Sequence, residues 1–77
     1  MSNILVVDDE PSICWGLSRL ARGMGHDVEV ASSAEQGLTR AARKRPDAVI
    51  LDVRLPGLDG MSAMAQFREH IGAAPII

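Results

Sequence analysis

The sequence predicts a doubly wound α/β fold, in which helices cover both faces of a parallel sheet. Two short apolar runs, Asn3–Val7 and Ala48–Leu51, are typical of strands that are buried on both faces. Segments with helical periodicity follow each of them, and such alternation favours right-handed crossovers between parallel strands. The 77 residues, of which 47% are hydrophobic, allow one small domain near the size at which a single core becomes marginal.

The first predicted helix spans residues 11–24. Pro11 suits its first turn, and Gly25 suits its C-terminal stop. We expect one apolar face to pack on the sheet, with Gly16 on that face where the helix would approach a strand closely. The side chains of this face are Ile13, Leu17, Leu20, Ala21 and Met24.

Trp15 lies almost opposite that face, and a large exposed aromatic side chain is uncommon. It either covers its own helix or a neighbouring element, or it forms a docking contact for a partner helix. Under the second interpretation, Ile13 near the helix start contributes to the same docking.

The next two predicted elements are an edge strand and a second helix. Asp27–Ala31 alternates polar and apolar residues, which indicates a strand with one wet side. Ser32 and Ser33 both have a capping-box partner three residues later, so the helix begins at one of them, and Pro46 ends it. Basic side chains in its last turns complement the helix dipole and are interpreted as solvated rather than as a phosphate or nucleic-acid site. They are Arg40, Arg43, Lys44 and Arg45.

A third helix is predicted from residue 60 or 61 to about residue 71, with Met64, Phe67 and Ile71 as its buried stripe. Residues 75–77 begin a fourth strand. The predicted strand order is 2-1-3-4, which makes the first and third strands neighbours.

Carboxylates directly follow both central strands. Asp52 follows the strand Ala48–Leu51, and Asp8 and Asp9 follow the first strand. The carboxyl ends of neighbouring parallel strands converge, so three like charges would face one pocket and raise one another's pKa unless a cation compensates. Oxygen ligands with no His or Cys nearby favour Mg²⁺. An alternative, compatible with the first, is that Asp8 and Asp9 cap the helix that begins near Pro11.

These acidic segments resemble the two most specific motifs of the receiver domain of bacterial two-component response regulators. The motifs are Val-Val-Asp-Asp-Glu-Pro after the first strand and Leu-Asp-Val-Arg-Leu-Pro-Gly-Leu-Asp-Gly after the third, and the resemblance extends over all 77 residues. It implies a flavodoxin-type sheet in which Asp52 is phosphorylated. It also implies that Asp8, Asp9 and Asp52 hold Mg²⁺ and that the backbone carbonyl of Arg54 completes the metal site. The Asp-Val-Arg-Leu-Pro-Gly run, with Ile-Cys-Trp-Gly-Leu in the first helix, is most similar to regulators of the nitrogen-control, enhancer-binding class.

The resemblance also identifies what these residues lack. A receiver continues to a Ser or Thr after its fourth strand and to a Lys after its fifth, and both bind the phosphoryl group. This sequence ends at Ile77, and neither Lys44 nor Thr39 lies where those residues are expected. Residues 1–77 are therefore expected to be the first two-thirds of a receiver, truncated before the fifth strand and unable to switch alone. The bare edge of the fourth strand favours pairing with a second copy.

We expect a phosphoacceptor signalling module rather than a stand-alone enzyme. The implied partner is a sensor histidine kinase or a phosphotransfer protein, and the output domain, which lies outside these residues, is expected to be transcriptional. One alternative is a fragment that acts only as a protein-interaction module. Another is an aspartyl-phosphate hydrolase, which usually places a second acid two residues after its nucleophile, where this chain has Arg54.

Composition argues against several other classes. A formal net charge of −2 is unfavourable for nucleic-acid contact by these residues. A dinucleotide-binding enzyme would carry a glycine-rich turn after its first strand, where this chain has Asp-Asp-Glu-Pro-Ser. No apolar run approaches membrane-spanning length, the start is not a signal peptide, and the single Cys14 cannot form an internal disulfide. A cytoplasmic location is therefore expected.

Overall fold

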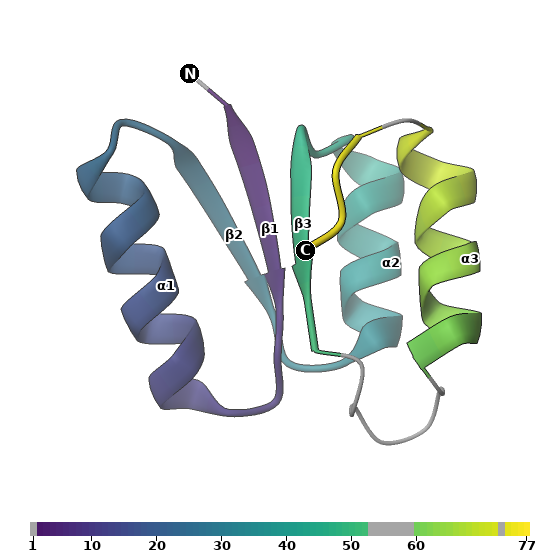
Figure 1. Cartoon of the computed structure of the whole chain (residues 1–77), viewed down its shortest axis with the longest axis horizontal. Coiled ribbons are helices and arrows are strands. Elements are labelled where there is room, and N and C mark those ends of the chain that lie inside the picture. The colour runs from purple at the N-terminus through teal and green to yellow at the C-terminus, as the bar shows by residue number, and fades with distance from the viewer. Residues whose placement is uncertain (1, 53–59, 73) are drawn as a thin grey trace.

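The computed structural model describes residues 2–52, 60–72 and 74–77, and these ranges contain three strands and three helices (Figure 1). The strands are β1 (Asn3–Val7), β2 (Asp27–Ala31) and β3 (Ala48–Leu51). The helices are α1 (Pro11–Gly23), α2 (Ala34–Arg43) and α3 (Gly60–Ile71). Figure 1 shows α1 on one face of the sheet and α2 with α3 on the other. The predicted doubly wound α/β fold is confirmed.

The sheet is parallel and its strands lie in the order β2-β1-β3. Beyond β3, Val49 forms a parallel bridge with Ile76. The Val49 amide donates to the Pro75 carbonyl at 2.9 Å, and the Ile77 amide donates to the Val49 carbonyl at 2.8 Å. A fourth strand therefore begins beside β3, as the predicted order 2-1-3-4 requires. Among the described strands β2 pairs with β1 alone, so it is the predicted edge strand.

The two ends of α1 follow the sequence signals closely. Pro11 occupies the first turn, where its missing N–H costs no hydrogen bond. The helix ends at Gly23, one residue before the predicted end, because Met24 already has a non-helical ψ of 4°. Gly25 then adopts a φ of 91°, and the His26 amide donates back to the Ala21 carbonyl at 3.1 Å. This is a Schellman motif, which needs a residue that tolerates the left-handed region.

The start of α2 is fixed by two serines and one glutamine. The Ser33 hydroxyl accepts from the Gln36 amide at 3.1 Å, so Ser33 rather than Ser32 is the N-cap. The Gln36 side-chain oxygen in turn accepts from the backbone amide and the hydroxyl of Ser32, both at 3.0 Å. The predicted capping box therefore forms, although its return bond reaches one residue further back than the usual geometry.

The predicted buried face of α1 is wrong in part. Ala21 is buried and Leu17 is half-buried, but the three large side chains are largely exposed. Ile13 is 46% exposed, Leu20 is 64% exposed and Met24 is 68% exposed. The residues that pack on the sheet are instead Cys14, Ser18 and Ala21. Small side chains at this spacing let the helix lie close to the strands, and the larger apolar side chains are displaced to its flank.

The main core lies between the sheet and the α2–α3 layer. It contains buried residues from all three described strands and from α2 and α3, among them Leu5, Val7, Ala31, Ala41, Val49, Phe67 and Ile71. Phe67 and Ile71 are fully buried, as predicted, whereas Met64 one turn earlier is 37% exposed. The prediction that Met64 is buried is therefore wrong.

The closest approach of a helix to the sheet is at Gly37, not at Gly16 as predicted. A Cβ atom at Gly37 would lie 2.7 Å from Val7 Cγ2 and 2.9 Å from Phe67 Cζ. A Cβ atom at Gly16 would have no neighbour within 4 Å, and this residue is exposed. The glycine that close packing requires is thus on α2, where β1, α2 and α3 meet.

Candidate functional site

The sheet register places the two acidic segments side by side. Val7 and Leu51, the last residues of β1 and β3, are partners in the parallel pairing. The next residue on each strand is an aspartate, and both aspartate amides are still held by the sheet. The Asp8 amide donates to the Ala31 carbonyl at 3.0 Å, and the Asp52 amide donates to the Val7 carbonyl at 2.9 Å. Hydrogen bonds of the sheet therefore fix the backbone positions of Asp8 and Asp52.

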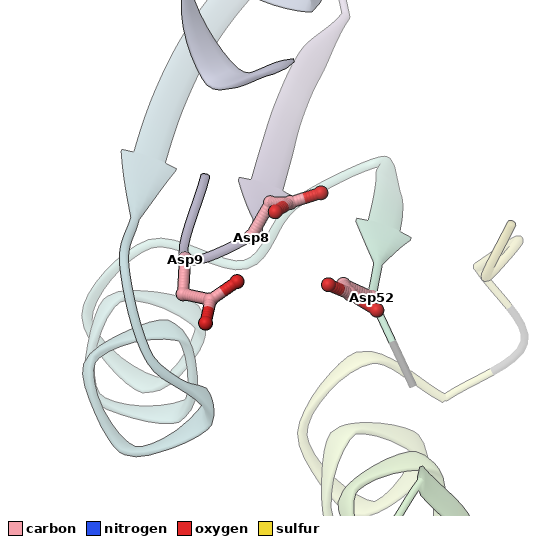
Figure 2. A group of neighbouring side chains, drawn as sticks. All are labelled: Asp8, Asp9 and Asp52. Carbon is pink, nitrogen blue, oxygen red and sulfur yellow. The ribbon is translucent and has the colours of Figure 1, made fainter. Parts of the chain in front are cut away.

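Asp8, Asp9 and Asp52 lie together at this edge of the sheet. Each offers one carboxylate oxygen, and these oxygens all lie within 4.8 Å of one another. Asp8 and Asp52 are half-buried, while Asp9 is exposed. Figure 2 shows the three side chains, with Asp8 and Asp9 on one side of the group and Asp52 facing them from the end of β3. The structure thus brings together the three acids that the sequence singled out.

The Asp8 side chain also shapes the turn into α1. One of its carboxylate oxygens accepts from the Glu10 amide at 2.9 Å. Glu10 is the N-cap residue, with an extended φ of −94°. Its side chain makes no capping bond and instead accepts from the Ser12 hydroxyl at 3.0 Å. The alternative that Asp8 and Asp9 cap α1 is therefore wrong, because the N-cap is Glu10. Asp8 instead accepts from a turn amide that precedes the helix.

Cys14 lies behind the acidic cluster, although the sequence interpretation placed no cysteine near it. Its thiol donates to the Asp8 carbonyl at 3.2 Å, and the side chain is 7% exposed. Burial raises the pKa of the Cys14 thiol, and the negative charge of Asp8 raises it further. The residue is thus a neutral hydrogen-bond donor that holds the Asp8 backbone. Nothing in the spacing between these residues predicts the contact, because it depends on the rotation of α1.

The donor set fits a hard divalent cation. Carboxylate oxygens are the ligands that Mg²⁺ prefers, and ligands on one such ion lie about 2.1 Å from it, hence at most about 4.2 Å apart. The oxygens of Asp8, Asp9 and Asp52 need only a small inward movement to meet that limit. The Cys14 thiol does not compete as a soft ligand, because it is protonated and directed at a backbone carbonyl.

The other residues singled out from the sequence have different positions. Arg54 lies outside the described residues. Trp15 is 64% exposed, and the Arg19 guanidinium carbon lies 5.0 Å from the centroid of its ring, which is a cation–π arrangement. Ile13 is also exposed, but residues two apart on a helix do not share a face. Ile13 and Trp15 therefore flank the first turns of α1 on different sides.

Along the described ranges, none of the helices has the length and apolar character needed to cross a bilayer.

Comparison with known families matches residues 4–77 to the response regulator receiver domain. Among curated proteins, the chain is 43% identical over 74 residues to the alkaline phosphatase synthesis transcriptional regulatory protein PhoP of Bacillus subtilis. It is 42% identical over 74 residues to the DNA-binding response regulator MtrA of Mycolicibacterium smegmatis. Each match covers 96% of the chain but only 31% and 32% of the relative, so the chain spans about a third of the length of these proteins.

Solved structures give the same result for the fold. The response regulator TrrA of Thermotoga maritima, in complex with Mg²⁺ and BeF, superposes with a TM-score of 0.89 at 34% identity. That match covers 99% of this chain and 66% of TrrA.

Proposed function

The chain belongs to the family of response regulator receiver domains, and from this premise we propose that it accepts a phosphoryl group on Asp52. The observation that carries the proposal is the meeting of three carboxylates at the adjoining ends of β1 and β3. The proposed donor is a phosphohistidine on a sensor histidine kinase or a phosphotransfer protein. Carboxyl ends of parallel strands are where α/β proteins of this topology bind ligands.

The proposed chemical step is an in-line displacement at phosphorus. A carboxylate oxygen of Asp52 attacks, a P–O bond forms, and the P–N bond to the donor imidazole breaks. The imidazole leaves with the bonding electron pair and takes up a proton. The products are an aspartyl acyl phosphate and a neutral histidine on the donor. The chain contributes position, because the bond from the Asp52 amide to the Val7 carbonyl fixes the nucleophile at the strand end.

We infer that Asp8, Asp9 and Asp52 hold Mg²⁺, with the backbone carbonyl of Arg54 as a further ligand. Three carboxylates this close repel an incoming phosphoryl group, so the site needs a compensating cation. When bound, the ion would offset the negative charge of the carboxylates and of the phosphoryl oxygens. The oxygen-only donor set supports this inference for the three aspartates. The part assigned to Arg54 rests on the family resemblance alone.

Docking of the donor is assigned to the first turns of α1, which begin two residues after Asp9. Trp15 carries a large exposed ring with Arg19 stacked on it, and Ile13 exposes an apolar side chain on the other flank. A partner helix that contacts both flanks would place its phosphohistidine near the acidic cluster. Aromatic and arginine side chains are common anchors of such interfaces.

The consequence proposed for phosphorylation is a change in an output domain. An acyl phosphate on Asp52 would bias an equilibrium between two conformations of the receiver, and the output domain would respond to that bias. The relatives PhoP and MtrA are transcriptional and DNA-binding regulators, which supports a transcriptional output and a cytoplasmic location. In this role the domain is a signalling module that is modified once per event, not a stand-alone enzyme.

The proposal is tested by labelling the full-length protein with acetyl phosphate and Mg²⁺ and mapping the added mass by peptide mass spectrometry. We expect one phosphoryl group, on Asp52, and none in the Asp52→Asn variant. Asp27→Asn is the matched control, because Asp27 is an exposed aspartate at the opposite end of the sheet. Labelling of Asp52→Asn at the wild-type level would refute the assignment, and equal loss of labelling in Asp27→Asn would show that the effect is not local.

A further inference from the structure

The basic side chains around the end of α2 fall into two groups. Arg45 has a structural partner, because its Nη2 donates to the Ile71 carbonyl at 2.9 Å and so caps the end of α3. Arg40, Arg43 and Lys44 have no side-chain hydrogen bond or ion pair within the described part of the chain. Favourable interaction with the helix dipole explains one cation at a helix end. It does not explain why Arg40, Arg43 and Lys44 all line the same hollow.

These three cations line two adjoining hollows on the surface of α2. The larger has a volume of about 400 Å³ and is lined by Glu35, Gln36, Thr39, Arg40 and Arg43. The smaller has a volume of about 210 Å³ and is lined by Glu29, Arg40, Arg43 and Lys44. Arg40 and Arg43 line both, so the two spaces adjoin. We call the two together the α2 hollow.

The edge strand supplies one wall of the smaller space. Glu29 on β2 pairs in register with Leu5, a residue of the core on the α2 side of the sheet. Its side chain is half-buried, and it lies in no ion pair within the described residues, although it shares the hollow with three cations. Three cations and two carboxylates therefore line the α2 hollow, in a chain whose formal net charge is −2. The hollow is a local excess of positive charge on an acidic protein.

Arg40 gives a second reason to expect a ligand. Its side chain is half-buried, and its Nε is a buried donor that has no hydrogen-bond partner among the described atoms. A buried donor without an acceptor is unfavourable, and its cost is removed when an acceptor binds. A modest rotation of the guanidinium would present its Nε and Nη edge to an oxyanion in the bidentate geometry that arginine favours.

We propose that the α2 hollow binds a small polyvalent oxyanion of the phosphate class. Two arginines offer planar donor pairs, and Lys44 adds a point charge. The amide nitrogen of Gln36 is an additional donor, since the Gln36 side-chain oxygen is already used by Ser32. The donors extend from Gln36 near the start of α2 to Lys44 after its last residue, so the site suits a diphosphate or a phosphorylated small molecule better than a single inorganic phosphate.

This site is separate from the acidic cluster. None of the three acids lines the α2 hollow. Figure 1 shows that α2 runs antiparallel to the strands, so its carboxyl end lies at the opposite end of the sheet from the residues that follow β1 and β3, whereas its first turn, which supplies Glu35 and Gln36, lies nearer to them. Arg43 is the last residue of α2, and Asp52 follows the last residue of β3. Binding in the α2 hollow can therefore be measured without interference from Asp52, and it does not depend on the function proposed above.

The test is a titration of the full-length protein with inorganic pyrophosphate in buffer free of divalent metal, followed by amide NMR shifts and calorimetry. We expect saturable shifts at α2 and β2 and none at Asp52. Arg43→Gln should weaken binding about tenfold, which is the loss of one charge-assisted contact. Because Arg43 is exposed, this variant should fold normally even where Arg40→Gln does not. Glu29→Gln should strengthen pyrophosphate binding, because it removes a negative charge from the lining of the α2 hollow.

Arg19→Gln is the matched control, since it makes the same change of net charge on α1, away from the hollow. Its pyrophosphate affinity should stay within about twofold of the wild type at fixed salt. The proposal is overturned if Arg19→Gln weakens binding as much as Arg43→Gln, or if no saturable shifts occur at α2. Citrate that binds as tightly as pyrophosphate would overturn the phosphate class.

Discussion

A Cβ atom on Gly37 would lie 2.7 Å from Cγ2 of Val7, so α2 packs against β1 at a distance that only glycine permits. Gly37→Ala should therefore destabilise the domain by roughly 1–3 kcal/mol, the usual cost of overpacking a core. Gly16→Ala makes the same chemical change at an exposed position of α1 with open space around it, and should stabilise by about 0.5–1 kcal/mol. Urea unfolding of the two variants in the full-length protein measures both changes in the free energy of unfolding. Equal stability of the two variants would contradict this packing.

Mg²⁺ affinity should depend unequally on the two acids after β1. Asp9→Asn should weaken binding strongly, and Asp8→Asn should weaken it less, because the resemblance suggests that Asp9 binds the ion directly and Asp8 through water. Asparagine at position 8 also keeps an oxygen that can accept from the Glu10 amide, so the turn into α1 should survive. Calorimetric titration with Mg²⁺ gives the affinities, with Asp27→Asn as the control. Unchanged affinity in Asp9→Asn would rule out its role as a ligand.

Cys14 should resist alkylation in the folded protein. Burial raises the pKa of its thiol and Asp8 raises it further, so the reactive thiolate is scarce at neutral pH and the sulfur is covered. Iodoacetamide should modify Cys14 far more slowly in native buffer than in urea, and the difference is read by mass spectrometry. Rapid labelling at pH 7 without denaturant would show that α1 opens or is rotated differently.

The same shift predicts the sign of a pH effect. The folded-state pKa of Cys14 lies above that of the unfolded thiol, so the folded protein binds this proton more tightly. The contribution of protonated Cys14 to the free energy of unfolding is therefore complete at pH values below the ordinary thiol pKa. It is lost as the pH rises through the folded-state pKa of Cys14. Cys14→Ala should flatten the alkaline side of the stability curve, measured by urea unfolding at several pH values.

Trp15→Ala should slow phosphoryl transfer from the partner kinase while leaving labelling by acetyl phosphate unchanged. The ring is 64% exposed and stacks on Arg19, so its loss should change stability little. Trp15→Phe keeps an aromatic face and should restore most of the transfer rate. If Trp15→Ala instead lowers the unfolding temperature markedly with transfer unaffected, the ring packs for stability and docking is elsewhere.

The parts of the fold that follow from local sequence were predictable. Strand ends, the cap at Ser33 and the Schellman stop at Gly25 depend on residues within a few positions of one another. The convergence of Asp8 and Asp52 followed from parallel topology, because register makes Val7 and Leu51 partners.

The rotation of α1 was not predictable from periodicity. Its apolar residues cover an arc wider than its contact with the sheet, and small residues such as Cys14 and Ser18 define the contact instead. The contact between Cys14 and Asp8 and the close approach at Gly37 both depend on how two elements pack, which no spacing within one element encodes.

The hydrogen bond from the Asp52 amide to the Val7 carbonyl also has a consequence for the order of folding. It joins residues far apart in the sequence, as does the pairing of Asn3 with Asp47 at the other end of the same strands. The carboxylates of Asp8 and Asp52 therefore meet only once β3 has docked on β1, which requires closure of the long chain segment between these strands. A cation that binds this acidic cluster can slow unfolding, but it has nothing to hold in the early, partly folded chain and should leave the refolding rate almost unchanged.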